Sequence, residues 1–175
     1  MKEIYLAGGC FWGAQKYLSL IPGVIYTEVG YANGHTINPT YKEVCEEDTG
    51  HVETVKVQYD PKQTSLTFLL DLFFDAIDPT TLNQQGQDVG IQYRSGVYYT
   101  NETDKTLVLS AIGELQKQYS HPIVVEVLPL SCFYLAEEYH QKYLDKNPMG
   151  YCHIGEELFA KARAAVEGLR KCSSR

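Results

Sequence analysis

The chain has 175 residues, a length that favours one compact domain and leaves little room for two. Its 15 Lys and Arg against 22 Asp and Glu give a formal net charge of −7, which argues against nucleic acid and anionic membranes as partners. No apolar run reaches the roughly 20 residues of a membrane span, and the N-terminal residues lack the pattern of a secretory signal, so we expect a cytoplasmic protein.

Hydrophobic periodicity and turn residues predict strands and helices separated by two long polar loops. The first strand ends at a Gly-Gly pair, and a helix follows it directly until Pro22-Gly23 stops it. In chain order the predicted elements are strand 4–9, helix 11–20, strand 24–31, loop 33–50, strand 51–59, helix 65–77, loop 78–93, strand 95–100, helix 101–119, strand 123–128, helix 133–146 and helix 156–171.

This order of elements matches a split βαβ unit followed by C-terminal additions. We therefore predict an α+β fold with a ferredoxin-like core, a two-layer α/β sandwich with a mixed sheet, long irregular loops and C-terminal helices. We expect residues 1–175 to form a single domain and the protein to be a monomer.

The cysteines and histidines indicate thiol chemistry without a metal. Five cysteines are an odd set in a chain without an export signal, which favours free thiols over a disulfide framework. Their spacing to one another and to the five histidines matches no zinc motif. We therefore expect no metal and no cofactor.

One cysteine lies where the first predicted strand passes into the first helix, in Gly9-Cys10-Phe11-Trp12-Gly13. Unpaired amides and the positive end of the helix dipole favour a thiolate there, so we expect the pKa of Cys10 to be lowered and its thiol to be reactive. The alternative is a buried cysteine that packs as a small hydrophobic residue. Phe11 and Trp12 either border the nucleophile or belong to the core, and periodicity does not separate these two possibilities.

A carboxylate follows in strand 51–59, where alternation places Glu53 on the same face as Val55 and Val57. A carboxylate on an apolar face is costly unless it is protonated or paired, and burial raises its pKa. A carboxyl group that stays neutral near pH 7 can act as a general acid. A bulge that turns Glu53 to solvent is the alternative.

Several segments resemble the methionine sulfoxide reductase A family, also called peptide methionine (S)-S-oxide reductases. The matching segments are Gly9 to Gly13, Gly30-Tyr31, Asn38 to Cys45, Asp48 to Glu53, Gln92 to Ser95, Phe133 to Glu137, Lys146 to Pro148 and Gly150 to Cys152. They cover residues 3 to about 153. The predicted helix 156–171 is atypical, because many members end in a Gly-rich tail with resolving cysteines.

The resemblance implies a thiol-dependent reductase of methionine S-sulfoxide, free or in proteins, that repairs oxidative damage. Cys10 would attack the sulfoxide sulfur and become a sulfenic acid, and Glu53 would donate a proton to the sulfoxide oxygen. The hydroxyl groups of Tyr41 and Tyr93 would be further donors, and Asp88 would hold the polar side of the site. The resemblance also implies that Phe11, Trp12 and Tyr93 line the pocket for the substrate methyl group.

Composition alone does not select Tyr41, Asp88 or Tyr93, which lie in or beside the two predicted loops. Their assignment therefore depends on the resemblance.

To regenerate the Cys10 thiol, a second thiol would condense with the sulfenic acid to form a disulfide, which thioredoxin or another thiol then reduces. Cys152 matches a family resolving position and is favoured, although the helix predicted from residue 156 can hold it away from Cys10. Cys172 is a rival, and direct regeneration by an external thiol remains a third possibility. Cys45 matches a family cysteine that has no resolving role here, and Cys132 matches no motif.

Two other classes of protein compete with a reductase. A cysteine hydrolase would pair Cys10 with a histidine, and His51 is the only histidine near an assigned residue, although the sequence contains no recognised nucleophile–base signature. A non-catalytic peptide-binding domain would use the Trp and Tyr surface as an anchor, and its binding would survive Cys10→Ser.

Overall fold

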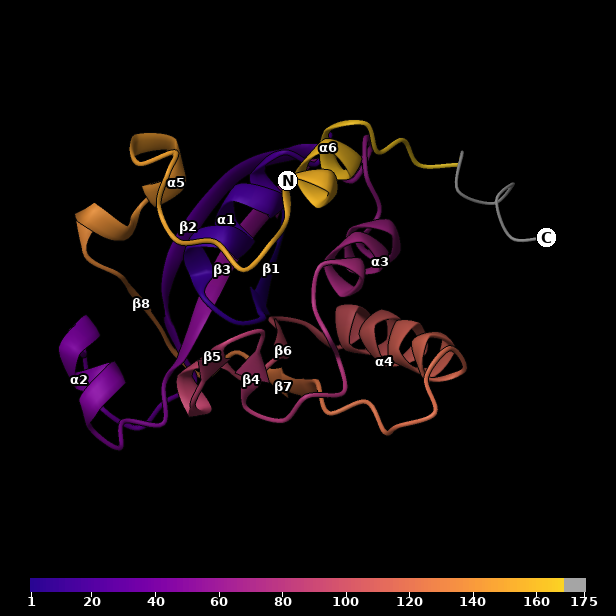
Figure 1. The fold of residues 1–175 in the computed structure, drawn as a ribbon. Coiled ribbons are helices and arrows are strands. Elements are labelled where there is room, and N and C mark those ends of the chain that lie inside the picture. Colours follow the sequence, from indigo (N-terminus) through magenta and orange to yellow (C-terminus); the bar gives the residue numbers. More distant parts are fainter. Residues whose placement is uncertain (169–175) are drawn as a thin grey trace.

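A computed structural model describes residues 1–168 of the protein (Figure 1). Within these residues a six-stranded sheet has the order β7-β6-β1-β3-β2-β8, in which β7 is Glu126–Pro129 and β8 is Phe133–Leu135. Neighbouring strands are antiparallel except β6 and β7, which are parallel, so the sheet is mixed and the fold is α+β. The central elements are β1 (Lys2–Ala7), α1 (Phe11–Ser19), β2 (Val24–Ala32), β3 (Val52–Tyr59), α3 (Leu66–Asp75) and β6 (Gly96–Tyr99).

The main core lies between the sheet and the helices α1 and α3. Val55 and Val57 on β3 are fully buried, as the alternation of that strand predicts. The hydroxyl of Tyr17 on α1 donates to the Leu72 carbonyl of α3 at 2.8 Å, which satisfies a buried phenol and ties the two helices together. Tyr31 on β2 lies opposite Glu53 on β3, so the register of these strands carries Glu53 to the end of the sheet where α1 begins.

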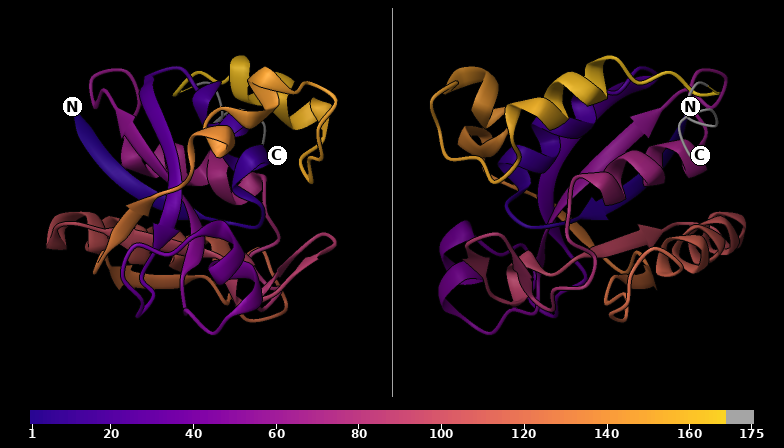
Figure 2. Two further views of the ribbon diagram at one scale, coloured as in Figure 1. Left: turned by 90° about the vertical axis from the view of Figure 1, so that its left-hand side faces the viewer. Right: turned by 45° about the vertical axis from the view of Figure 1, so that its right-hand side comes forward.

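Two further helices complete the cover of the sheet (Figure 2). Helix α4 (Glu102–Gln116) packs against α3, β6 and β7 (Glu126–Pro129), and α6 (Glu156–Arg163) packs beside α1. The side chain of Asn101 caps α4 by accepting the Asp104 amide at 2.9 Å. No helix in residues 1–168 has the length and apolar character that a membrane crossing requires.

The prediction of one helix over residues 133–146 is wrong. The segment forms β8 (Phe133–Leu135), a 3-10 turn η2 (Glu138–His140) and a short helix α5 (Tyr143–Lys146). β8 adds to the free edge of β2, and the missing side chain of Gly30 allows this, because a Cβ there would lie 2.4 Å from the Tyr134 carbonyl oxygen. Pairing with a sheet edge therefore overrides the helical period of the sequence.

Both predicted loops contain regular structure. Within 33–50 lies α2 (Tyr41–Glu46), which begins with a capping box in which Thr40 and Glu43 satisfy each other's backbone amides. Within 78–93 lie a small hairpin, β4 (Gln84–Gln85) with β5 (Asp88–Val89), and a 3-10 turn η1 (Ile91–Tyr93). Helix α2 and this hairpin lie at the end of the sheet where β1 ends and β3 begins (Figure 1).

The last helix is shorter than the predicted 156–171, because α6 ends at Arg163. The chain then leaves the helix, and Glu167 accepts hydrogen bonds from the amide and hydroxyl of Ser65, the N-cap of α3. A carboxylate at this helix N-terminus satisfies a free amide and meets the positive end of the dipole. This contact requires a turn where continued helix was predicted.

Candidate active site

Cys10 and Glu53 meet at the N-terminus of α1. Cys10 is the N-cap residue, and its side chain makes no capping hydrogen bond. The Phe11 amide, one of the free donors at this helix end, instead donates to Glu53 Oε2 at 2.9 Å. Gly9 has φ +76°, a left-handed conformation that favours glycine, and its amide donates to the Tyr93 carbonyl at 3.2 Å. The turn that carries Cys10 is therefore held from β3 and from η1.

Glu53 is buried, with 2% of its surface exposed, which confirms the burial predicted from strand alternation. Burial raises the pKa of its carboxyl group to about 8, and the nearby charge of Asp88 acts in the same direction. The Phe11 amide opposes both effects by favouring the anion. At pH 7 the carboxyl group is therefore mostly protonated and can donate a proton.

The expectation of a lowered pKa for Cys10 is wrong for the resting enzyme. Its exposed fraction is 8%, and burial raises the pKa of the thiol, with a further increase from the Glu53 charge. The Trp12 amide does favour the thiolate, as the position at a helix N-terminus predicts, but its effect is the smaller one. Desolvation of the anion thus outweighs the helix terminus, and the resting nucleophile is a protonated thiol.

The structure brings Tyr41, Asp88 and Tyr93 to the same site. Tyr41 is the first residue of α2 and Tyr93 the last of η1. Burial raises the pKa of both phenols, and the charge of Glu53 raises it further. Asp88 on β5 accepts the hydroxyl of Tyr151 at 3.0 Å. Its charge also raises the pKa of Cys10 and Glu53, so these groups share one electrostatic environment.

Phe11 and Trp12 have different surroundings. Phe11 belongs to the main core and exposes 1% of its surface, whereas Trp12 is only partly buried. The Trp12 indole donates to His140 Nδ1 at 2.9 Å and stacks on Tyr143 with ring centroids 3.7 Å apart. This support fixes the orientation of the indole beside Cys10.

The sequence did not indicate His140, Tyr143 or Tyr151 as site residues. His140 is fully buried and contacts both the Phe11 and the Tyr41 rings, at centroid distances of 5.1 and 4.6 Å. From the sequence one expects only that the indole N–H of Trp12 needs a hydrogen-bond acceptor, and this does not identify the residue that supplies the acceptor.

Cys152 lies against the first turn of α1. A Cβ built at Gly13 would be 2.9 Å from Cys152 Sγ, so the segment between α5 and α6 crosses this helix closely (Figure 1). The helix that begins at Glu156 therefore does not hold Cys152 away from the turn that carries Cys10. Cys45 lies on α2, and the Cys132 thiol faces the Gly34 carbonyl at 3.7 Å. Cys172 lies outside the described residues.

His51 cannot serve as the base of a cysteine hydrolase in this arrangement. Its Nδ1 accepts the Gly34 amide at 3.1 Å, and its Nε2 contacts the Thr36 carbonyl at 2.8 Å. Both ring nitrogens are thus used to hold the loop after β2.

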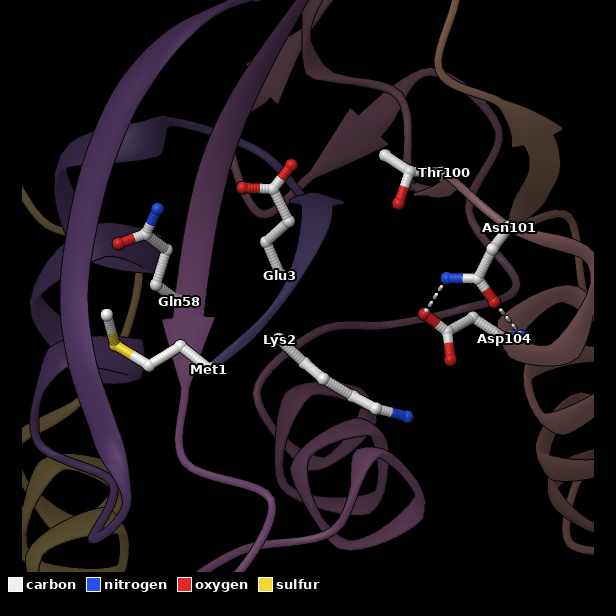
Figure 3. Close-up of a pocket in the computed structure, with 7 residues that line it drawn as sticks. All are labelled: Met1, Lys2, Glu3, Gln58, Thr100, Asn101 and Asp104. Carbon is white, nitrogen blue, oxygen red and sulfur yellow. Dashed lines mark hydrogen bonds between the residues drawn. The ribbon is translucent and has the colours of Figure 1, made fainter.

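Two cavities in residues 1–168 differ in their relation to this site. A cavity of about 460 Å³ opens beside Cys152, between α5 and α6, with Lys16 of α1 and Arg163 of α6 on its wall. A smaller cavity of about 280 Å³ contains none of the predicted site residues (Figure 3). Its lining residues are Met1, Lys2, Glu3, Gln58, Thr100, Asn101 and Asp104.

Comparisons with known proteins agree with this geometry. Residues 2–168 match the family described as peptide methionine sulfoxide reductase. The peptide methionine sulfoxide reductase MsrA of Lachnoclostridium phytofermentans is 58% identical over 164 residues, which are 94% of this chain and 99% of that protein. The protein of the same name from Clostridium acetobutylicum is 53% identical over 161 residues, 92% of this chain and 99% of that protein.

Solved structures show the same likeness. The reduced form of Mxr1 from Saccharomyces cerevisiae superposes with a TM-score of 0.83 at 42% identity, over 86% of this chain and 88% of that one. Mxr1 in complex with Trx2 matches with a TM-score of 0.58 at 28% identity, over 81% of this chain and 84% of that one. The match over residues 2–168 and the identity to these relatives establish that the chain belongs to the peptide methionine sulfoxide reductase family.

Proposed function

We propose that Cys10 and Glu53 carry out the reduction of methionine S-sulfoxide, free or within proteins, that membership of this family implies. The observation that carries this proposal is that both residues lie at the N-terminus of α1. The amide of Phe11, the residue after Cys10, donates a hydrogen bond to the Glu53 carboxyl group there. A buried acid and a buried thiol, with Phe11 and Trp12 directly after the thiol in the chain, suit an uncharged substrate with a polar oxygen.

The chemical step conserves protons within the site. Cys10 Sγ attacks the sulfoxide sulfur while Glu53 donates its proton to the sulfoxide oxygen. The proton of the Cys10 thiol passes to Glu53. The hydroxyl group then moves from the substrate sulfur to Cys10 Sγ as the bond between the two sulfurs breaks, which leaves Cys10 as a sulfenic acid and releases methionine. The raised pKa of Glu53, about 8, keeps this donor protonated at neutral pH.

The substrate methyl group would lie against Trp12, whose indole is held by His140 and Tyr143, with Phe11 behind it and the Tyr93 ring as a further wall. The hydroxyl groups of Tyr41 and Tyr93 would act as donors to the sulfoxide oxygen, since both share the environment of Glu53. Asp88, fixed by Tyr151, would hold the polar side. A pocket with one apolar side and one donor side distinguishes the two sulfoxide epimers.

Cys152 would resolve the sulfenic acid by forming a disulfide with Cys10. Its contact with the first turn of α1 supports this pairing, and the cavity of about 460 Å³ beside it gives a thiol reductant access to its sulfur. We infer that thioredoxin or a similar thiol is this reductant.

One set of variants tests the proposal. Cys10→Ser should abolish methionine formation with dithiothreitol, and Glu53→Gln should slow single-turnover reduction by about a hundredfold or more while substrate affinity changes little. Cys152→Ser should complete one turnover and stall with thioredoxin, yet still cycle with dithiothreitol. Cys132→Ser, at a thiol that faces the Gly34 carbonyl and has no proposed role, is the control. An unchanged chemical step in Glu53→Gln would remove it from the acid role, and a stall that persists with dithiothreitol would contradict the resolving role.

We also infer a ferredoxin-like core in a single domain. The strand order β6-β1-β3-β2, with α1 and α3 as the two crossovers, supports this description. We further propose that the protein is a monomer of the cytoplasm, a reducing compartment in which thiols stay free.

A further inference from the structure

His153, the residue after Cys152, is half-buried, and both nitrogens of its imidazole are shielded from solvent. Both of its ring nitrogens are buried, and neither reaches a partner with hydrogen-bond geometry among the described residues. Buried polar atoms of this kind are rare and costly, so an unpaired imidazole near a reactive centre calls for a functional explanation.

The imidazole lies beside Cys152 and beside the turn that carries Cys10. A Cβ built at Gly13 would meet His153 Nδ1 at 3.3 Å and Cys152 Sγ at 2.9 Å, so this nitrogen and the Cys152 thiol face the same position on α1. A Cβ built at Gly9 would meet His153 Nε2 at 3.1 Å. Because Gly9 directly precedes Cys10, the second nitrogen lies on the turn that carries the nucleophile.

The charge that acts on the ring comes from Asp88 on β5. The titratable residues Tyr151 and Cys152 precede His153 in the chain, and the Tyr151 hydroxyl donates to Asp88. Burial lowers the pKa of His153, and the Asp88 charge and the Gly8 backbone act against this effect without reversing it. The ring is therefore neutral at neutral pH, with one nitrogen free to accept a proton.

We propose that His153 transfers a proton from the Cys152 thiol to the oxygen that leaves Cys10 when the disulfide forms. This inference rests on the proposed roles of Cys10 and Cys152. His153 Nδ1 takes the proton from Cys152 Sγ as that sulfur attacks Cys10 Sγ, and His153 Nε2 gives up its own proton to the departing oxygen.

The step balances without any further reactant. The Cys10 sulfur–oxygen bond breaks, the bond between the two sulfurs forms, and the oxygen leaves as water with the proton from the imidazole. In the resting state the Cys152 thiol faces the Ile154 carbonyl at 3.2 Å, so it must turn toward the ring before it reacts.

The experiment follows one turnover of methionine S-sulfoxide without reductant and measures two rates separately. Methionine formation reports the reductase step, and loss of free thiol with mapping of the Cys10–Cys152 bridge reports disulfide formation. We expect His153→Gln and His153→Phe to form methionine within twofold of the unmodified rate. Disulfide formation at pH 7 should slow by about a hundredfold, and a sulfenic acid should accumulate that dimedone traps. His121→Gln, on an exposed histidine, is the control.

The pH profile supplies a test on the unmodified enzyme. With a neutral imidazole as base, disulfide formation should be flat from about pH 6.5 to the pKa of the Cys152 thiol, whereas in His153→Phe it should rise about tenfold per pH unit. A rise of that slope in the unmodified enzyme, or equal slowing of both rates in the variants, overturns the proposal. If the unmodified enzyme forms no methionine, the proposed reductase function fails. If methionine forms and no bridge to Cys152 follows, the resolving role of Cys152 and the role of His153 fail together while the reductase step stands. If the bridge forms at an equal rate in the His153 variants, the role of His153 fails alone.

Discussion

Glu53 is expected to make the stability of this protein depend on pH in a way that a single substitution removes. The change is Glu53→Gln, which keeps the size of the side chain and a carbonyl oxygen that can accept the Phe11 amide, now at 2.9 Å from Glu53 Oε2. It removes a carboxyl group with 2% exposure and a pKa raised by burial from 4.5 to about 8.

The sign follows from proton binding in the two states. Above pH 4.5 the unfolded chain has lost the Glu53 proton while the native protein keeps it up to about pH 8, so the native state binds more protons and stability falls as pH rises. Each pKa unit corresponds to about 1.4 kcal/mol, and the loss across this window is therefore roughly 5 kcal/mol. This is a large part of the 5–15 kcal/mol that is typical of a folded domain.

Urea denaturation at intervals from pH 4.5 to 8.5 measures this effect as the difference in unfolding free energy between Glu53→Gln and the unmodified enzyme. We expect the difference to move in favour of the variant across the window and then to level off. Glu114→Gln, on the exposed face of α4, is the matched control and should show no such trend. A difference that stays constant with pH within about 1 kcal/mol would show that Glu53 ionises normally in the native state and would refute its role as a protonated acid.

Two further predictions concern the nucleophile and the indole beside it. Iodoacetamide should label Cys10 more slowly than the half-buried Cys132 in the resting enzyme, because Cys10 is the more buried thiol. Glu53→Gln should speed labelling of Cys10 at pH 9, because the substitution removes a charge that raises the thiol pKa. Faster labelling of Cys10 than of Cys132 would mean that the helix terminus outweighs burial. His140→Phe should shift the fluorescence emission of Trp12, the only tryptophan, and raise KM several-fold, because it removes a hydrogen bond to the indole that contributes roughly 1 kcal/mol. His140→Asn, which keeps an acceptor near the position of Nδ1, should have neither effect. Equal effects of the two variants would mean that packing, and not the hydrogen bond, holds the indole.

The sequence predicts those parts of the fold where local period and burial agree. The alternation of 51–59 places Glu53 on the buried face, and a Gly-Gly turn before an amphipathic segment places Cys10 at a helix start, both as observed. The sequence-based prediction fails for residues 133–146, where pairing with the free edge of β2 and the close approach of the Tyr134 carbonyl to Gly30 decide the structure. Pairing partners that are about a hundred residues away leave no local signal in the segment.

The same limit applies to the site. The helix position of Cys10 is visible in the sequence, but the burial that raises its pKa is not, so the sequence predicted the wrong direction. Trp12 was visible as an aromatic neighbour, whereas its partners His140 and Tyr143 come from a segment far along the chain. Family resemblance located Tyr41, Asp88 and Tyr93 because it carries tertiary information that periodicity lacks.

The two raised pKa values describe an acid and a thiol that both stay neutral until substrate arrives. Below about pH 8 Glu53 holds its proton, and Cys10 holds its own because burial penalises an anion there. If either group ionises alone, a new negative charge appears near Asp88 in a poorly solvated site, which is costly. The Cys10 thiol therefore ionises favourably only when its proton passes to Glu53 as Glu53 gives its own proton to the sulfoxide oxygen. With the roles proposed for Cys10 and Glu53, nucleophile and acid then act together, and a thiol that is unreactive toward other electrophiles becomes reactive toward a substrate that accepts a proton.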